Sequence, residues 1–401
     1  MTRPNRFLRA ASRLALLAAI VAACSGGDPI LANPPAPVPS LAPATARPSP
    51  IADPVPIELP RDDAPHDRLT EWWYYTGHLQ TADGRRFGFE YVIFRAERGA
   101  FPTSWASHLA VTDEAGGRFL YSQRLEIGPG VDRSPDGTGE PHGFDLAITG
   151  PDPSQPASAG RAPWTMSGAN GSDRLNAALS PDEAGRAGVP GGLGLDLSLE
   201  STKPVVLHDR DGWIDFGPAG GSYYYSRTAM TATGNLTVDG RQTPVEGTAW
   251  FDHQWGDFIS VGGGGWDWFA VNLDDGTDLT LSLVRDADGT YPLIYGTLVS
   301  PDRGVEHLDR DAFTVSSTGS WVSPATRAEY PAGWTIELPG QHLAIELTPT
   351  VADQELDTRA TTGVVYWEGS QVVRATRDGA PLGGEAYVEL TGYAPTGPAS
   401  P

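Results

Sequence analysis

The feature that most constrains the fold is a long succession of short β-type runs separated by Gly, Pro and Asp. Residues Glu71–Gln80 and Arg86–Arg95 are two aromatic-rich runs joined by a turn-rich connection at 82–85, which predicts a β-hairpin. Around 193–199, leucine recurs at every second position, as one face of a strand requires. No segment longer than about ten residues has the period of an amphipathic helix. We therefore predict an all-β chain of antiparallel sandwiches or barrels.

The length and the glycine distribution predict two folded domains. The chain has 401 residues, enough for two domains of ordinary size. Strand-like runs lie on both sides of Gly262-Gly263-Gly264-Gly265, which we interpret as a flexible crossover between two bodies. The expected N-terminal domain covers residues 60–258, and the expected C-terminal domain covers residues 259–396.

Residues 1–23 have the pattern of a bacterial lipoprotein signal peptide. A basic n-region precedes an apolar run at 14–23 that is too short to span a bilayer. The run ends in Val21-Ala22-Ala23-Cys24, and Cys24 is the single cysteine of the chain. We expect Cys24 to carry a lipid anchor; the alternative is a signal cut elsewhere that leaves a free thiol. The predicted location is the cell envelope, on the extracytoplasmic side of a membrane.

The segment that follows is predicted to be a disordered, proline-rich linker at 24–59. Residues 25–56 contain ten prolines and no aromatic side chain, so they cannot bury a core.

The formal net charge of the whole chain is −22. A surface of that sign repels nucleic acid, which we exclude as a partner. The expected partners are a membrane, through the anchor, and a small apolar ligand; the sequence leaves the oligomeric state open.

The stretch 247–257 concentrates aromatic and ionisable side chains. In a strand, Phe251, His253 and Trp255 share one face and Asp252 points to the other, so Asp252 cannot orient its neighbour His253. An imidazole between two aromatic rings is a candidate acid–base group. The alternative is a buried strand whose polar groups satisfy one another.

Glu90 is an unusual carboxylate within the expected hairpin. Both faces of the hairpin are mostly apolar, so we expect it to be covered on both sides. Burial would raise the pKa of Glu90 unless a partner compensates. The alternative interpretation pairs Glu90 with an arginine such as Arg95 or Arg227.

Several motifs, in a fixed order, resemble a known family. They are Glu71-Trp72-Trp73-Tyr74-Tyr75-Thr76-Gly77-His78-Leu79, Tyr223-Tyr224-Tyr225-Ser226, Ala249-Trp250-Phe251-Asp252-His253-Gln254-Trp255, Gly265-Trp266-Asp267-Trp268-Phe269, Asp275-Gly276, Gln354-Glu355-Leu356, Tyr366-Trp367-Glu368-Gly369 and Tyr387-Val388-Glu389-Leu390-Thr391-Gly392-Tyr393. From about Pro60 to Tyr393 the chain resembles the lipocalin-like family of the carotenoid 1,2-hydratases (hydroxyneurosporene synthases) and AttH-like proteins. The resemblance implies two consecutive lipocalin-like β-barrels able to enclose an apolar ligand.

The resemblance also implies roles for two residues. The His and Trp of the hydratases' Asp-His-x-Trp motif, which are implicated in their chemistry, match His253 and Trp255. The hydratases also use a Tyr and an Asp further along, where this chain reads Asp278-Leu279-Thr280-Leu281-Ser282-Leu283 and has no tyrosine. The match to the Asp-His-x-Trp motif therefore does not imply that this chain hydrates carotenoids.

The sequence is compatible with three functions, and it leaves open whether the protein is an enzyme. The first is binding of an isoprenoid or lipid; the second is an acid–base hydro-lyase or isomerase that adds water to, or rearranges, a terpenoid-like substrate; the third is glycan binding. The candidate catalytic residues are His253, Trp255, Asp252 and Glu90. The candidate ligand-binding residues are Trp72, Tyr74, His78, His108, Tyr224 and Trp266.

We expect no cofactor and no metal, because the eight histidines show neither His-x-His nor His-x-x-x-His spacing. His78 and His108 are the histidines that a barrel could bring towards His253. The alternative for both is a histidine satisfied within the core.

The lipid anchor is directly testable. Replacing Cys24 with Ser removes the acylated atom, so we expect the protein to move from the membrane fraction to the soluble exported fraction. Fractionation followed by immunoblotting measures this. A Ser variant that stays in the membrane fraction would place the anchor elsewhere.

Overall fold

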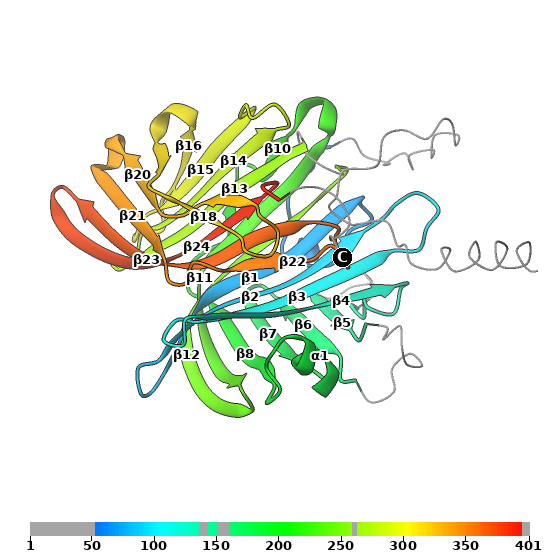
Figure 1. Ribbon diagram of the computed structural model, residues 1–401. Coiled ribbons are helices and arrows are strands. Elements are labelled where there is room, and N and C mark those ends of the chain that lie inside the picture. Colours follow the sequence, from blue (N-terminus) through cyan, green and yellow to red (C-terminus); the bar gives the residue numbers. More distant parts are fainter. Residues whose placement is uncertain (1–52, 136–142, 151–160, 259–262, 395–401) are drawn as a thin grey trace, which may run out of the picture.

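The computed structural model describes residues 53–135, 143–150, 161–258 and 263–394, and these are almost entirely β-structure (Figure 1). Cys24 and most of the expected linker lie outside the described residues, as does the connection at 259–262. In the described ranges, no helix is both long and apolar enough to cross a membrane.

The N-terminal half forms one large, mainly antiparallel, barrel-like sheet. Its strands run in the order β4-β3-β2-β1-β12-β11-β8-β7-β6-β5, with β9 and β10 pairing with β11. The bounds are β1 (Thr70–Thr81), β2 (Arg86–Ala96), β3 (Ser104–Asp113), β4 (Arg118–Ile127), β5 (Phe144–Ile148), β6 (Trp164–Ala169), β7 (Ser172–Ala178), β8 (Leu193–Ser201), β9 (Val206–Leu207), β10 (Trp213–Asp215), β11 (Gly221–Val238) and β12 (Arg241–Gly256).

The C-terminal half repeats this architecture. Its main sheet has the order β16-β15-β14-β13-β24-β23-β21-β20-β17, with β22 pairing with β23, and β18 and β19 form a separate pair. The bounds are β13 (Gly263–Leu273), β14 (Asp278–Asp286), β15 (Leu293–Val299), β16 (Val305–Asp309), β17 (Thr314–Ser317), β18 (Ser320–Val322), β19 (Glu329–Pro331), β20 (Trp334–Leu338), β21 (Leu343–Pro349), β22 (Glu355–Asp357), β23 (Val365–Arg377) and β24 (Ala380–Thr391). Figure 1 shows this half, in yellow to red, against the blue, cyan and green half.

The all-β prediction is confirmed, and two barrel-like sheets follow one another as the family resemblance implies. Strands β1 and β2 form the predicted hairpin, with Glu71 opposite Arg95. The helical elements of the described residues are short: α1 (Pro181–Arg186), η1 (Arg61–Asp63), η2 (Gly217–Ala219), η3 (Arg310–Ala312) and η4 (Pro339–Gln341). The glycine run differs from expectation, because residues 263–265 already belong to β13.

Most of strand β1, and β12 from Ala249 to Gly256, are buried on both faces. Trp73 and Phe251 point into the apolar core of the N-terminal sheet. Tyr74 and Trp250 point the other way, into a second apolar cluster that also contains Trp268 of β13. The C-terminal sheet has a separate core of its own. The two sheets therefore pack face to face, and the predicted covering of the β1–β2 hairpin on both sides is confirmed.

A buried ion pair fixes α1 against β4. Ser180 and Glu183 form a capping box at the start of α1, as the Ser-x-x-Glu pattern favours. The guanidinium of Arg124 donates from Nε to Glu183 Oε1 at 2.9 Å and from Nη2 to Oε2 at 3.0 Å. The two side chains are only 1% and 2% exposed. Burial opposes ionisation of Glu183, but the Arg124 and Ser180 hydrogen bonds outweigh it and hold its pKa below 4.5.

Glu183→Gln should therefore be strongly destabilising. It leaves the Arg124 charge buried without a counter-charge, so the free energy of unfolding should fall by about 3–5 kcal/mol. Because the folded-state pKa is lowered, the unfolded chain binds more protons as the pH falls. The wild type should hold this stability above pH 4.5, the carboxyl's ordinary pKa, and lose it below that value, whereas the variant loses less. Urea denaturation at several pH values measures both effects.

Glu346→Gln is the matched control, because Glu346 lies exposed on β21. It should change the free energy of unfolding by less than about 0.5 kcal/mol. Equal losses in the two variants would contradict the importance of the buried pair.

Candidate functional site

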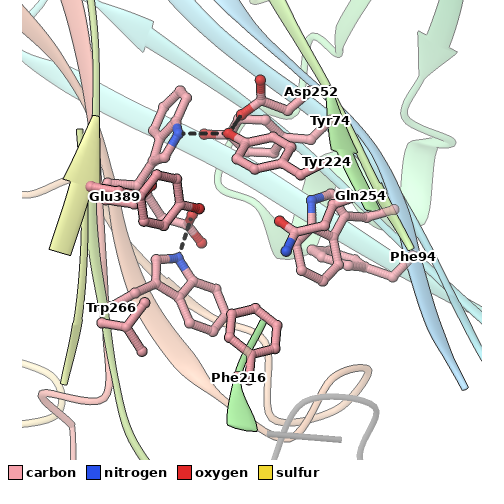
Figure 2. A pocket seen from close by; sticks show the side chains of 13 residues that line it. Tyr74, Phe94, Phe216, Tyr224, Asp252, Gln254, Trp266 and Glu389 are labelled. Carbon is pink, nitrogen blue, oxygen red and sulfur yellow. Dashed lines mark hydrogen bonds between the residues drawn. The ribbon is translucent and has the colours of Figure 1, made fainter. Parts of the chain in front are cut away.

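A pocket lies between the two sheets (Figure 2). The N-terminal sheet and its loops contribute mainly Trp72, Tyr74, Phe94, Phe216 and Tyr224. The C-terminal sheet contributes Trp266, Trp268, Val284 and Tyr295. Its cavity volume is about 80 Å³, within about 750 Å³ of space between protein atoms that includes open solvent. Its walls are mostly aromatic, which suits a small apolar molecule.

Strand alternation decides which side chains reach this pocket. On β1, Trp72 and Tyr74 face the C-terminal sheet, whereas Trp73 between them belongs to the core of the N-terminal sheet. On β12, Asp252 and Gln254 line the pocket for the same reason. These four side chains are thus held by strand segments that are buried on both faces.

Glu389 of β24 is the acidic group on the C-terminal side of the pocket. Trp266 Nε1 donates a hydrogen bond of 2.8 Å to Glu389 Oε2. Burial raises the pKa of Glu389 to about 7, the Trp266 hydrogen bond opposes that rise, and the negative charge of Asp252 adds to it. The carboxyl is therefore divided between its neutral and ionised forms near neutral pH, as general acid–base catalysis favours.

Asp252 and Tyr224 form a hydrogen-bonded pair on the opposite side. Tyr224 donates to Asp252 Oδ2 at 2.5 Å, and Trp268 Nε1 donates to the Tyr224 oxygen at 3.1 Å. The other carboxylate oxygen of Asp252 accepts hydrogen bonds from Ser226 and from Trp250 Nε1. Burial raises the pKa of Asp252 to about 6, against the effect of these donors. Figure 2 shows Tyr224 and Asp252 across the pocket from Glu389.

Glu90 is buried between the sheets but does not line this pocket. Its Oε1 accepts a hydrogen bond of 2.8 Å from the hydroxyl of Tyr366, and burial raises its pKa to about 8. The alternative pairing of Glu90 with an arginine is wrong, because Arg95 pairs with Glu97 and Arg227 pairs with Asp63.

His253 and Trp255 lie on the other face of β12, inside the N-terminal sheet. The His253 Nε2 atom lies 2.9 Å from Glu71 Oε1, and burial lowers the pKa of this histidine. The candidate catalytic residues His253 and Trp255 therefore do not share a cavity with the candidate ligand-binding residues Trp72 and Tyr74, because the register places Trp73, not Trp72, beside His253. Their catalytic role stays a prediction. Together with His66 and Glu71, His253 forms a group of side chains able to hold a metal ion.

His78 and His108 face the C-terminal sheet. The His78 Nε2 atom lies 3.2 Å from Ser370 Oγ, and His108 Nδ1 lies 2.7 Å from the hydroxyl of Tyr366. Neither lines the pocket that contains Glu389. They do not approach His253, since β1 and β3 project them from the opposite face of the sheet. The alternative interpretation, a buried histidine with hydrogen-bond partners in the core, is confirmed for both.

The structure thus brings five predicted residues into one pocket and leaves five outside it. Those inside are Trp72, Tyr74, Tyr224, Asp252 and Trp266. Glu389 was not predicted, although it lies in one of the motifs that carry the family resemblance. A local signal was available in the sequence, because Glu389 is a carboxylate between the apolar residues Val388 and Leu390.

Solved structures share this architecture. A structure assigned to AttH from Nitrosomonas europaea is 29% identical, covers 86% of this chain and 100% of that chain, and has a TM-score of 0.70. Kievitone hydratase from Nectria haematococca is 16% identical, covers 80% of this chain and 88% of its own, and has a TM-score of 0.56, which shows a shared fold.

A curated relative matches over part of the sequence. The dehydratase asqC from Emericella nidulans is 25% identical over 167 residues, which are 40% of this chain. The match spans 47%, about half, of that relative's length. A protein-family model described as AttH-like matches residues 50–393, nearly all of the part that folds into the two sheets. The chain belongs to the AttH-like family.

Proposed function

We propose that the protein is an acid–base hydro-lyase that adds water to, or removes it from, an apolar unsaturated small molecule bound between the two sheets. The observation that carries this proposal is Glu389, a carboxyl in an aromatic pocket with one oxygen held by Trp266 and a pKa of about 7. The partial likeness to a protein named as a dehydratase supports the same reaction class.

Dehydration would use the two sides of the pocket together. Neutral Glu389 gives its proton to the departing hydroxyl group as the C–O bond breaks, and water leaves. The proton on the adjacent carbon passes to the Tyr224 oxygen while the Tyr224 proton moves to Asp252 along their hydrogen bond of 2.5 Å. A C=C bond forms and tyrosinate does not accumulate. Hydration reverses these steps.

The aromatic walls contribute to both binding and rate. Trp72, Tyr74 and Trp268 present apolar surface that excludes water from the reacting atoms. Their rings also stabilise positive charge that develops at carbon as the C–O bond lengthens, by about 0.5–2 kcal/mol for each well-placed ring. The substrate class is therefore an isoprenoid-like or aryl-bearing alcohol and its alkene.

The proposed location follows from the sequence. The signal pattern and Cys24 favour a lipid-anchored protein on the extracytoplasmic side of a membrane. Apolar substrates partition into membranes, so an enzyme tethered there meets them at high local concentration.

Glu389→Gln tests the proton transfer. Glutamine keeps an oxygen for Trp266 but has no proton to donate, so turnover should fall by about 10²–10⁴-fold with KM nearly unchanged. A panel of terpenoid and aryl-bearing alcohols provides the substrates, and chromatography of the alkene products measures dehydration. Glu337→Gln, on the exposed face of β20, is the matched control and should keep wild-type turnover.

Two results would count against this function. One is unchanged turnover in Glu389→Gln. The other is a wild-type protein that binds Nile red in the pocket but turns over no member of the panel, as a carrier of apolar ligands would.

The pH profile tests the same carboxyl independently. Neutral Glu389 is the donor for dehydration, so kcat/KM should fall as the pH rises through about 7. The Trp266 hydrogen bond lowers this pKa. Trp266→Phe removes that bond, so the fall should move to higher pH. A fall that stays in place or moves to lower pH would exclude Glu389 as the titrating donor.

A further inference from the structure

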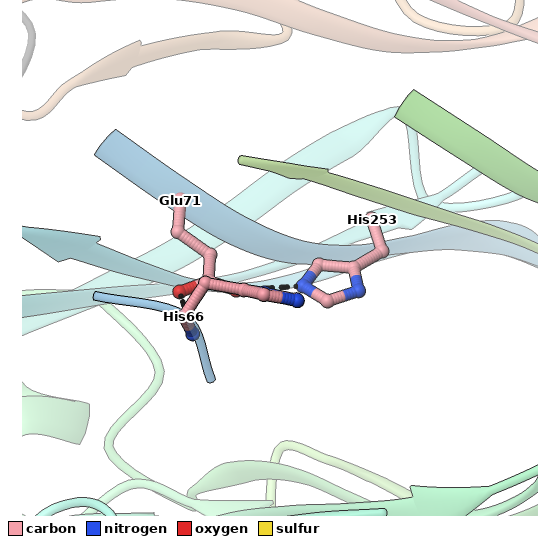
Figure 3. Close-up of side chains that lie close together, drawn as sticks. All are labelled: His66, Glu71 and His253. Atoms are coloured by element: carbon pink, nitrogen blue, oxygen red, sulfur yellow. Dashed lines mark hydrogen bonds and ion pairs between the residues drawn. The ribbon is translucent and has the colours of Figure 1, made fainter. Parts of the chain in front are cut away.

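A compact group of nitrogen and oxygen donors lies inside the end of the N-terminal sheet, away from the pocket (Figure 3). His66 Nδ1 lies 2.7 Å from Glu71 Oε1, and His253 Nε2 lies 2.9 Å from the same oxygen. The three donor atoms all lie within 4.8 Å of one another. Figure 3 shows the two imidazole rings directed towards the Glu71 carboxylate.

Three parts of the chain hold these donors rigidly. His66 precedes β1, Glu71 lies in β1, and His253 lies in β12. The His66 ring stacks on Trp255 with a centroid distance of 4.0 Å and an interplanar angle of 2°. The His253 ring lies 4.7 Å from the rings of both Trp73 and Trp255. Such packing fixes ring orientation, as a preorganised ligand set requires.

The hydrogen-bond partners of His253 show why two histidines that face the same oxygen, Glu71 Oε1, need an explanation. Tyr225 has a single hydroxyl proton, and it is donated to Asp63 Oδ1 at 2.5 Å. His253 Nδ1, 3.2 Å from the Tyr225 oxygen, must therefore carry the proton of that contact. In the neutral ring, His253 Nε2 then presents a lone pair to the carboxylate of Glu71. A cation between them satisfies both atoms.

The surrounding groups have the arrangement that orients metal-bound histidines. Such histidines usually donate their other ring N–H to an oxygen atom. His253 does so through Tyr225, which Asp63 holds in turn. The second ring nitrogen of His66 lies 3.6 Å from Asp62 Oδ1, a carboxylate that also pairs with Arg61.

We propose that His66, Glu71 and His253 form a binding site for one divalent transition-metal ion of the Zn²⁺ class. Two imidazoles and one carboxylate are a known zinc ligand set that leaves a fourth position for water. Tetrahedral bonds of about 2.0–2.1 Å place ligand atoms roughly 3.3 Å apart, so metal binding requires each histidine nitrogen to move away from Glu71 Oε1 by about half an ångström. The side chain of His66 is 19% exposed, which gives the ion a route from solvent.

The ion would join the segment before β1 to the two central strands. His66 lies only four residues before Thr70, where β1 begins, and nothing else in this group comes from outside the sheet. The site is separate from the proposed catalytic pocket, because β12 directs His253 and Asp252 to opposite faces. No motif spacing pointed to this site, because His66 and His253 lie 187 positions apart in the sequence.

Metal titration of the untagged full chain tests the proposal. After dialysis against dipicolinate, the wild type should bind one equivalent of Zn²⁺ or Co²⁺ per chain, and Co²⁺ should give visible d–d absorption. His66→Gln removes a ligand from a partly exposed position and should weaken binding more than about 100-fold, beyond the 10–100-fold cost of losing a supporting contact. His307→Gln is the matched control, a partly exposed histidine elsewhere, and should keep one equivalent.

His66→Cys makes the test specific. A thiolate at this position should keep Co²⁺ binding and add a sulfur-to-cobalt charge-transfer band that the wild type, which already has Cys24, does not show. Folding of each variant is checked by circular dichroism. No stoichiometric binding by the folded wild type would overturn the proposal, as would equal binding by folded His66→Gln. In either case the cluster is a proton-bridged ion pair.

Discussion

The constraint on which the structure depends is that most of β1, and β12 from Ala249 to Gly256, are buried on both faces. Each barrel-like sheet needs an apolar core, and the two sheets also pack against each other, so successive side chains enter different interiors. On β12, Phe251 belongs to one interior and Trp250 to the other. A polar side chain on such a strand cannot reach bulk water and needs a partner within the protein.

Burial explains why the carboxyl groups of Asp252 on β12 and Glu389 on β24 have shifted pKa values. Asp252 receives three hydrogen bonds from neutral donors, and burial still raises its pKa. Glu389 receives a hydrogen bond from Trp266, and burial raises its pKa to about 7. Both carboxyls line the pocket, and the pKa of Asp252 is lower, about 6. Glu389 therefore keeps its proton to higher pH than Asp252, which is why Glu389 is the proton donor of the pair.

Much of the fold could be predicted from the sequence, whereas less of the candidate site could be predicted. Alternation predicted the β1–β2 hairpin and the opposite orientations of Asp252 and His253, because both depend on local period alone. The convergence of residues from different strands depends on register and on packing between sheets. Trp72 and Trp73 are adjacent in sequence, and only the register shows that Trp73 accompanies His253. The hydrogen bond between Glu389 and Trp266 could not be predicted, because the two residues lie 123 positions apart in the sequence.

The charge state of Glu389 is the most direct test of the proposed chemistry. Infrared difference spectra of the wild type and Glu389→Gln, recorded against pH, isolate the C=O band of this one carboxylic acid. A band present in the wild type below pH 7, absent from the variant and titrating near pH 7, is the predicted result. A Glu389 carboxyl that titrates at its ordinary pKa of 4.5 would contradict its role as the proton donor.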